Sequence, residues 1–434
     1  MIKKIIKKII IFLLQFEARL ILKKYKPKII AISGTVGKTS AKDAIYRVLS
    51  SKLKVRKSEK SYNNEIGVPL TIIGSKSGWN NVFAWIFNLI KGLKVIFSKN
   101  HYPSWLILET GVDRPGDMGK MLKLIRPDIG VITALGEIPV HIEYFKEIED
   151  LIREKAKILQ ALKKDNFAIL NCDDKGILEL KSKIDASIIT YGFSEEADFK
   201  ASNYRIIFRK EGDREIPEGI SFKVDYQGNI IPVRLYGSFG RQIVYAALAS
   251  MAVGSILNFN LVEMAELLSN YESPPGRLRL LEGIKHSSIL DDTYNSSPIA
   301  VRTALELLKE IPAKRKISVL GDMLELGKYT IEEHRRMGRM AKESADILFF
   351  IGPRSKFAAE EAEIEGVKKE NIFEFSTSEE VKMTVQEKIK EGDLILIKGS
   401  QSMRMEKITE EIMLHPEKKE ELLVRQEKEW LNRS

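Results

Sequence analysis

The stretch "AISGTVGKTSAKD", residues 31–43, constrains the fold of this chain more than any other. Ile29 to Ile32 is a short apolar run typical of a buried strand, and good helix formers follow from Ala41 to Leu49. The loop between them departs from the common phosphate loop G-x-x-x-x-G-K-[ST], because the position six residues before Lys38 is Ile32 and not glycine. The order of strand, tight loop and helix still predicts an α/β unit whose helix start faces an anion.

The same alternation continues along the chain and predicts the fold class. Short apolar strands that end in polar residues are expected within 105–113, 127–138 and 166–174, with helical stretches between them. Strands that alternate with helices form a parallel, doubly wound sheet, with sites at the carboxyl ends of the strands. Residues 197–236 instead alternate with a period of two and contain glycine turns, which predicts β-hairpins at the edge of this domain.

A break at Pro274, Pro275 and Gly276 predicts a domain boundary. Further short strands with polar ends follow it, so a second α/β unit is expected there. At 434 residues the chain is long enough for more than one core. We therefore expect an α/β protein with a P-loop-type, doubly wound ATPase domain at 28–272 and a smaller Rossmann-like domain at 273–434.

The basic character of the chain belongs to its first segment. Residues 1–28 hold eight lysines, Arg19 and one acid, Glu17, whereas the whole chain has a net charge of +10. This distribution excludes a chain-wide nucleic-acid surface. Apolar residues at helical spacing, among them Ile9, Leu13 and Phe16, lie opposite a row of lysines and predict a basic amphipathic helix at 1–27. Its uninterrupted apolar run is too short to span a bilayer, and no signal-peptide cleavage site follows.

Two interpretations of that helix stay open. Residues 1–24 lie on an anionic membrane surface, or they pack on the domain behind them with their lysines in water. A second apolar segment, residues 78–105, interleaves aromatic residues with Lys91, Lys94 and Lys99. We expect a helical hairpin packed on the core there, with a second interfacial contact as the alternative. The single cysteine, Cys172, excludes an intrachain disulfide and suits a reducing cytoplasm.

Three residues carry chemistry by their placement alone. Backbone N–H groups at the helix start can meet phosphate, Lys38 can reach the β/γ oxygens, and the Thr39 hydroxyl can ligate Mg²⁺. Glu109 closes the strand "WLILE", where a carboxylate can hold a metal ion near the phosphates. His141 and Lys155 carry little by themselves, since a solitary histidine is more often structural and a helical lysine is more often solvated.

Several longer motifs occur together in a fixed order. They are "SGTVGKTS", "SYNNEIGVPLT", "LETGVDRPGDM", "HIEYF" and "KAKIL", then "PPGRLRL", "DDTYNSSPIAVRTAL", "VLGDMLELG" and "IKGSQSMRMEKI". In this combination the chain resembles the Mur ligases from about Lys28 to Lys407. The resemblance is closest to the MurF-type branch, which adds D-alanyl-D-alanine to UDP-N-acetylmuramoyl-tripeptide. The loop of that family is G-[ST]-x-G-K-[ST], the short form present in this chain.

The resemblance implies an ATP-dependent amide ligase of peptidoglycan precursor synthesis, of class 6.3.2.10, that works through an acyl phosphate. It implies catalytic roles for Lys38, His141 and Lys155, the last of these carbamylated, and Mg²⁺ at Thr39, Glu109 and His141. It implies ATP contacts at Gly34, Thr35, Gly37, Lys38, Thr39, Ser40, Arg277, Asp292 and Asn295. It places the acceptor near Asn63, Asn64, Tyr294, Lys398 and Ser400. The implied partners are a UDP-MurNAc-peptide-like acceptor and D-Ala-D-Ala, and no nucleic acid is expected. The implied protein is a cytoplasmic monomer. In the membrane-surface interpretation it lies peripheral to the inner face of the membrane.

The chain departs from that branch in four places, one of which is the added apolar segment 78–105. MurF-type ligases begin with a domain that grips the UDP-sugar, and the expectation is that this domain is lacking, since only the basic helix precedes the ATPase strand. The helix position usually written His-Asn reads Arg241-Gln242, and "GEIPVH" is longer than the usual Gly-x-x-His. Two alternatives therefore accompany the main prediction. One is a ligase for another or a lipid-linked acceptor at the membrane, and the other is a nucleotide-binding, membrane-associated scaffold without enzyme activity.

Overall fold

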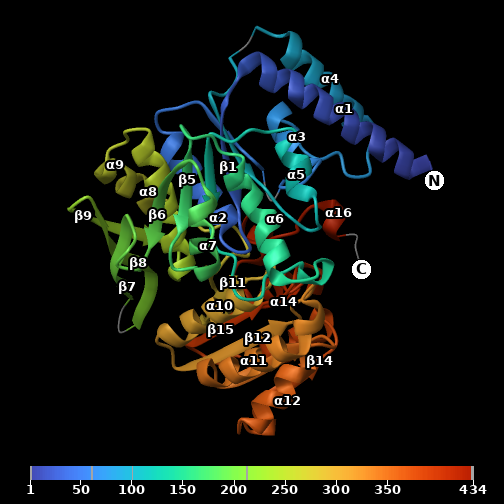
Figure 1. Cartoon of the computed structure of the whole chain (residues 1–434). Helices are drawn as coiled ribbons and strands as arrows, with labels where there is room; N and C mark the ends of the chain where they lie inside the picture. Colours follow the sequence, from blue (N-terminus) through green and yellow to red (C-terminus); the bar gives the residue numbers. More distant parts are fainter. Residues whose placement is uncertain (1, 60–61, 100, 212–213, 432–434) are drawn as a thin grey trace.

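The structure is a computed structural model that describes residues 2–59, 62–99, 101–211 and 214–431. Two sheets organise it, one above the other in Figure 1. The first has nine strands in the order β2-β3-β1-β4-β5-β6-β7-β8-β9, and its members up to β7 pair in parallel. The strands are β1 (Lys28–Ser33), β2 (Val55–Lys57), β3 (Trp105–Glu109), β4 (Ile129–Ile132), β5 (Phe167–Asn171), β6 (Ser187–Gly192), β7 (Phe199–Glu211), β8 (Arg214–Tyr226) and β9 (Asn229–Tyr236).

The predicted doubly wound arrangement of the first unit is confirmed. Alternate residues of β1 face opposite layers: Ile30 and Ile32 pack in one apolar cluster, and Ile29 and Ala31 pack in another. The first layer contains α2 (Lys38–Leu49), α8 (Arg241–Ile256) and α9 (Leu261–Ser269). The second contains α1 (Ile2–Tyr25), α3 (Gly67–Ile73), α5 (Asp117–Leu122), α6 (Ile148–Gln160) and α7 (Lys175–Leu178). β7, β8 and β9 pair antiparallel and extend the edge of the sheet.

The second sheet begins at Arg279 and has the order β10-β11-β15-β12-β13-β14. Only β10 is antiparallel, so this unit has the expected Rossmann-like pattern. The strands are β10 (Arg279–Glu282), β11 (Ser288–Asp292), β12 (Arg315–Gly321), β13 (Ile347–Ile351), β14 (Ile372–Phe375) and β15 (Asp393–Lys398). The helices are α10 (Pro298–Glu310), α11 (Thr330–Ser344), α12 (Lys356–Ile364), α13 (Ser378–Lys388), α14 (Glu406–Ile412), α15 (Lys419–Leu422) and α16 (Lys428–Leu431).

Strand order decides where the functional side chains meet. β3, β1 and β4 are neighbours, so the residues that follow their carboxyl ends share one edge of the first sheet. In the second sheet β11 and β15 are neighbours, and the register pairs Asp292 with Lys398. The carboxyl ends of both sets of strands contribute residues to one cavity between the two units, among them Lys38, Glu109, Asp292 and Lys398.

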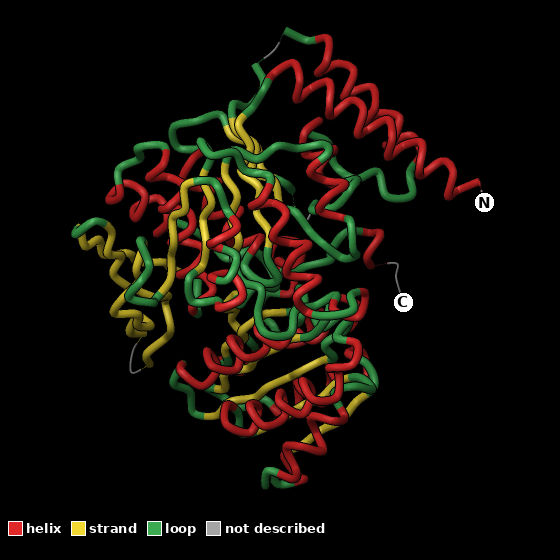
Figure 2. Tube along the Cα trace, viewed as in Figure 1, coloured by secondary structure: helices red, strands yellow, loops and turns green. Residues whose placement is uncertain are grey.

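Segment 78–105 differs from the hairpin that its sequence predicts. It forms one helix, α4 (Val82–Phe97), in which Gly92 is not a turn residue but the point of close contact with Glu17 of α1. α4 lies beside α1 at the edge of the molecule, as both the ribbon and the tube show (Figures 1 and 2). No described helix is both long enough and apolar enough to cross a membrane.

The amphipathic helix predicted at the N-terminus is present as α1, whose side chains are described from Lys8 onward. Leu14, Ala18 and Ile21 face the protein and are fully buried. The apolar stripe that contains Ile9 and Leu13 points away from the core. The packed-helix interpretation therefore describes one side of α1. The apolar stripe on the other side has no partner among the described residues.

Candidate active site

The short loop after β1 depends on two glycines. Gly34 has φ +144°, and a Cβ there would lie 2.2 Å from Oγ1 of Thr133 and 3.1 Å from the carbonyl oxygen of Ala134. Gly37 is left-handed, with φ 85°, and precedes the first residue of α2. Between them the Thr35 N–H donates to Ala134 O at 2.6 Å, and the Thr133 hydroxyl donates to the carbonyl of Val36 at 2.6 Å. The end of β4 thus fixes the loop from the side.

Two lysines converge on this loop. The ammonium of Lys38 donates to the carbonyl oxygens of Gly34 and Thr35 at 2.8 and 3.2 Å, and burial lowers its pKa. Lys155 comes from α6 and is buried, and its Nζ donates to Oγ1 of Thr35 at 2.9 Å. Burial first, and then the charge of Lys38, lowers the pKa of Lys155 to about 7. The loop is therefore a cationic pocket with backbone N–H groups at a helix start, an arrangement that favours phosphate.

A set of oxygen ligands lies beside the loop. The Thr39 hydroxyl donates to Oε2 of Glu109 at 3.1 Å, and Asn63 Nδ2 lies 3.5 Å from Oε1 of the same carboxylate. Arg277, from the second unit, reaches the Thr39 hydroxyl at 3.4 Å. A hydroxyl and one carboxylate next to a phosphate loop fit Mg²⁺, which takes few protein oxygens and completes its shell with phosphate and water.

His141 joins the two units. It is left-handed, with φ 71°, and its Nδ1 lies 2.6 Å from Oε2 of Glu325, a residue that follows β12. Its Nε2 lies 3.5 Å from Oδ1 of Asp113. In the part of the chain that the structure describes, no three histidine, cysteine, aspartate or glutamate side chains are grouped as a metal site. The role of His141 as a metal ligand therefore stays a prediction.

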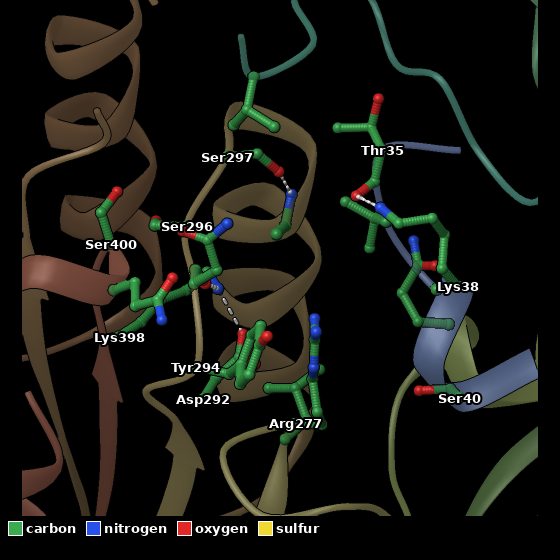
Figure 3. A pocket seen from close by; sticks show the side chains of 18 of the residues that line it. Thr35, Lys38, Ser40, Arg277, Asp292, Tyr294, Ser296, Ser297, Lys398 and Ser400 are labelled. Carbon is green, nitrogen blue, oxygen red and sulfur yellow. Dashed lines mark hydrogen bonds and ion pairs between the residues drawn. The ribbon is translucent and has the colours of Figure 1, made fainter. Parts of the chain in front are cut away.

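The second unit presents a paired lysine and a stacked arginine. Nζ of Lys398 donates to Asp292 Oδ2 at 2.6 Å and to the carbonyl of Asn295 at 2.9 Å, and burial lowers its pKa. The guanidinium of Arg277 lies 4.0 Å from the centroid of the Tyr294 ring. Figure 3 shows these side chains opposite Thr35, Lys38 and Ser40, with Ser400 at the far side. Asp292 is therefore a pairing partner of Lys398 as well as a candidate ATP contact.

One cavity of about 680 Å³ collects most of the predicted site residues. Those that line it are Thr35, Gly37, Lys38, Ser40, Asn63, Glu109, His141, Arg277, Asp292, Tyr294, Asn295, Lys398 and Ser400. Gly34, Thr39 and Lys155 lie behind the lining and contact it through Lys38, Glu109 and Thr35 respectively. Asn64 lies outside it, where its Oδ1 accepts hydrogen bonds from the N–H groups of Ile66 and Gly67 at the start of α3.

Several residues of the site were not predicted. Thr133 follows β4 and lies against Gly34, and Glu325 follows β12 and lies against His141. Each pair is distant in sequence, so no local signal identifies Thr133 or Glu325. Gln242 lines the cavity at the position where the sequence departs from the His-Asn pattern, and that departure was the available signal. Arg425 is buried, and its guanidinium donates to the carbonyl oxygens of Thr293 and Tyr294. Trp430 of α16 also lines the cavity.

Comparisons with known proteins give one consistent family. The model described as "Mur ligase middle domain" matches residues 88–254, and that described as "Mur ligase, glutamate ligase domain" matches 276–401. A curated relative from Bacillus subtilis (strain 168), named UDP-N-acetylmuramoyl-tripeptide--D-alanyl-D-alanine ligase, is 27% identical over 405 residues, 93% of this chain and 79% of the relative.

Solved structures agree on the fold. MurF from Acinetobacter baumannii superposes with a TM-score of 0.74 at 22% identity, over 92% of this chain and 79% of that one. MurF ligase from Thermotoga maritima, in complex with ADP, superposes with a TM-score of 0.73 at 23% identity, over 92% of this chain and 83% of that one. At these identities the likeness supports the arrangement of two α/β units and says nothing further about substrates.

Proposed function

The chain belongs to the Mur ligase family, and we propose that it is an ATP-dependent ligase that joins D-alanyl-D-alanine to a UDP-MurNAc-tripeptide-like carboxylate. The observation that carries the proposal is the single cavity in which the Lys38 loop of one unit faces Arg277 and the Asp292–Lys398 pair of the other. The name of the Bacillus subtilis relative supports the choice of substrates.

The proposed reaction has two steps. A carboxylate oxygen of the acceptor attacks the γ-phosphorus of ATP, the bond to the β-phosphate oxygen breaks, and ADP and an acyl phosphate result. The amine of D-alanyl-D-alanine then attacks the acyl carbon, inorganic phosphate leaves, and the amine loses a proton. Lys38 and the N–H groups that open α2 hold the γ-phosphate, and Arg277 reaches the same place from the other unit.

We assign Mg²⁺ to Thr39 and Glu109, with His141 toward a second ion. When bound, the metal neutralises charge on the phosphate oxygens. Lys155 is proposed to carry a carbamate, which would give it a negative charge in place of an ammonium that the metal ions would repel. The pKa of Lys155, about 7, supports this, because only a neutral amine reacts with carbon dioxide. At pH 7 about half of the Lys155 side chains are neutral.

We place the enzyme in the cytoplasm as a monomer. A second candidate is a ligase for a lipid-linked acceptor, held at the inner membrane face through residues 1–24. The outward direction of the apolar stripe on α1 favours it, since such a stripe has no partner among the described residues.

The test is phosphate release by the purified chain with ATP, UDP-MurNAc-tripeptide and D-alanyl-D-alanine. We expect turnover only when all three are present, and a loss of at least about 100-fold in Lys38→Ala. Lys123→Ala, on an exposed lysine at the end of α5, is the matched control and should retain activity. Turnover with a lipid-linked acceptor alone would select the second candidate. ATP binding without turnover on either acceptor would indicate a nucleotide-binding scaffold.

A further inference from the structure

α4 has its apolar face on the outside. Its two buried positions are Asn88 and Gly92, whereas Phe83, Phe87 and Phe97 are 82%, 66% and 81% exposed. Seven large apolar side chains of this helix are exposed in all. A surface helix of a globular protein normally has the opposite arrangement, with its large apolar residues toward the core. α4 therefore presents a water-facing stripe that folding alone does not explain.

α1 adds a second stripe beside the first. The two helices run in the same direction, since Glu17 lies against Gly92 and Tyr25 donates to the carbonyl oxygens of Val95 and Ser98. With its core-facing side occupied, α1 exposes four further large apolar side chains from Lys8 onward, where its side chains are described. Together the two helices supply eleven of the twenty large apolar residues that are exposed among the described residues of the chain. We call this the α1/α4 surface; it consists of the exposed side chains of Lys8–Lys24 and Val82–Phe97.

The α1/α4 surface is held in place by the protein. Lys24 donates to the carbonyl oxygens of Ile96 and Ser98 at 2.7 and 2.5 Å and so ties the ends of the two helices together. On the protein side of α4, Asn88 Nδ2 donates to the carbonyl of Lys76 at 2.8 Å, and the ammonium of Lys91 donates to the carbonyl of Gly74. Asn88 and Lys91 of α4 therefore bond inward beside the partly buried Trp85, Leu89, Val95 and Ile96, while seven other large apolar side chains remain outward.

Charge identifies the partner. Lys8, Arg19, Lys23, Lys24 and Lys94 are the exposed basic residues of the α1/α4 surface, and its one acid, Glu17, is buried. The wider segments 1–28 and 78–105 together contain twelve lysines and arginines and no other acid. The rest of the chain is close to neutral, because the net charge of the whole is +10. Arg19 and Lys23 are exposed seven residues after Phe12 and Phe16, so they continue the same face of α1. A second copy of this chain would bring two cationic surfaces together, whereas an anionic lipid surface complements both the apolar groups and the charge.

We propose that the α1/α4 surface docks the protein onto an anionic lipid bilayer, with α4 supplying most of the inserted apolar groups. The helices lie in the interface and do not span it, in keeping with the length and composition of every described helix. Trp79 comes three residues before α4, and its ring lies edge-on to that of Trp430, which lines the cavity. This ring contact links the segment that precedes α4 to the lining of the cavity. The inference does not require the proposed ligase activity, since binding to lipid is measured without substrates.

Flotation of the full chain with vesicles tests it. We expect the protein to float with phosphatidylcholine vesicles that contain phosphatidylglycerol, and to bind pure phosphatidylcholine at least about tenfold more weakly. Phe83→Asp/Phe87→Asp should lower binding to the anionic vesicles by at least about tenfold. Ile364→Asp, on an equally exposed apolar residue of α12 in the other unit, is the matched control and should bind like the unchanged chain.

A second measurement covers the case in which the double variant fails to fold, as judged by circular dichroism. A polarity-sensitive dye on Phe87→Cys should shift to the blue on addition of anionic vesicles, and the same dye on Ile364→Cys should not; the native Cys172 is buried. Failure of the unchanged chain to float, or equal binding by the folded double variant, would overturn the proposal. So would light scattering that shows a dimer dissociated by Phe83→Asp/Phe87→Asp, because the surface would then join two copies of the chain.

Discussion

Glu17 is a buried carboxyl between α1 and α4, and its replacement by glutamine tests how the two helices hold together. A Cβ at Gly92 would come 1.9 Å from Oε2 of Glu17, so the contact is close. That oxygen has no hydrogen-bond partner among the described residues. Burial raises the pKa of Glu17 from 4.5 to about 7. The folded chain therefore binds this proton more tightly than the unfolded chain does.

The sign and size of the effect follow from that shift. Below about pH 4.5 the carboxyl is neutral in both states and carries no penalty, and the free energy of unfolding falls as the pH rises toward about 7. The full shift corresponds to about 3 kcal/mol, and screening at this edge of the molecule reduces it to about 1–2 kcal/mol. Glu17→Gln keeps the shape and removes the charge. It should therefore stabilise the α1–α4 contact at pH 8 and change little at pH 4.5.

Hydrogen exchange of the α1 backbone amides measures this contact locally, which matters because a chain with two units need not unfold in one step. Corrected for intrinsic rates, protection in Glu17→Gln should exceed that of the unchanged chain by about tenfold at pH 8. Glu149→Gln, on an exposed glutamate of α6, is the control and should leave α1 unaffected. Equal protection in the unchanged chain and Glu17→Gln at pH 8 would refute the reasoning.

Three further predictions concern the cavity. Gly34→Ala should abolish ATP binding in calorimetry, because its Cβ meets the end of β4, whereas Gly119→Ala, with nothing within 4 Å, should bind normally. Lys155→Ala should lower turnover by at least about 100-fold, and turnover of the unchanged chain should fall when carbon dioxide is removed; indifference to both would exclude a carbamate. Asp292→Asn leaves Lys398, at the end of β15, buried without its carboxylate and should lower the free energy of opening of β15 by about 3–5 kcal/mol. Glu343→Gln, in an exposed pair, should lower it by at most about 1 kcal/mol, as measured by hydrogen exchange of the β15 backbone amides.

The sequence predicted the parts of this site that local pattern determines. The loop of Lys38 lies between a strand and a helix, and Glu109 closes a strand, so periodicity and parallel-sheet logic place both at one edge. The second α/β unit was also predicted, because short strands with polar ends recur after residue 276. The assignments of His141 and Lys155 depended on resemblance, since neither has a local signal.

The remaining features depend on contacts between distant residues. The ion pair of Asp292 with Lys398 arises from the register of β11 on β15, and the contact of His141 with Glu325 joins the two units. The outward direction of the apolar stripe on α1 follows from the burial of Leu14, Ala18 and Ile21 on the opposite side of the helix, in a cluster with residues of distant elements. Periodicity identifies an apolar stripe on a helix, but it does not show which side of the helix packs on the core.

The central claim is that the cavity activates a carboxylate by phosphorylation. The most direct measurement uses UDP-MurNAc-tripeptide whose terminal carboxylate carries ¹⁸O, together with ATP and D-alanyl-D-alanine, with mass analysis of the released phosphate. An acyl phosphate requires each phosphate to leave with one labelled oxygen from the acceptor. Phosphate released without label would mean that water attacks ATP in this cavity, and it would contradict the account.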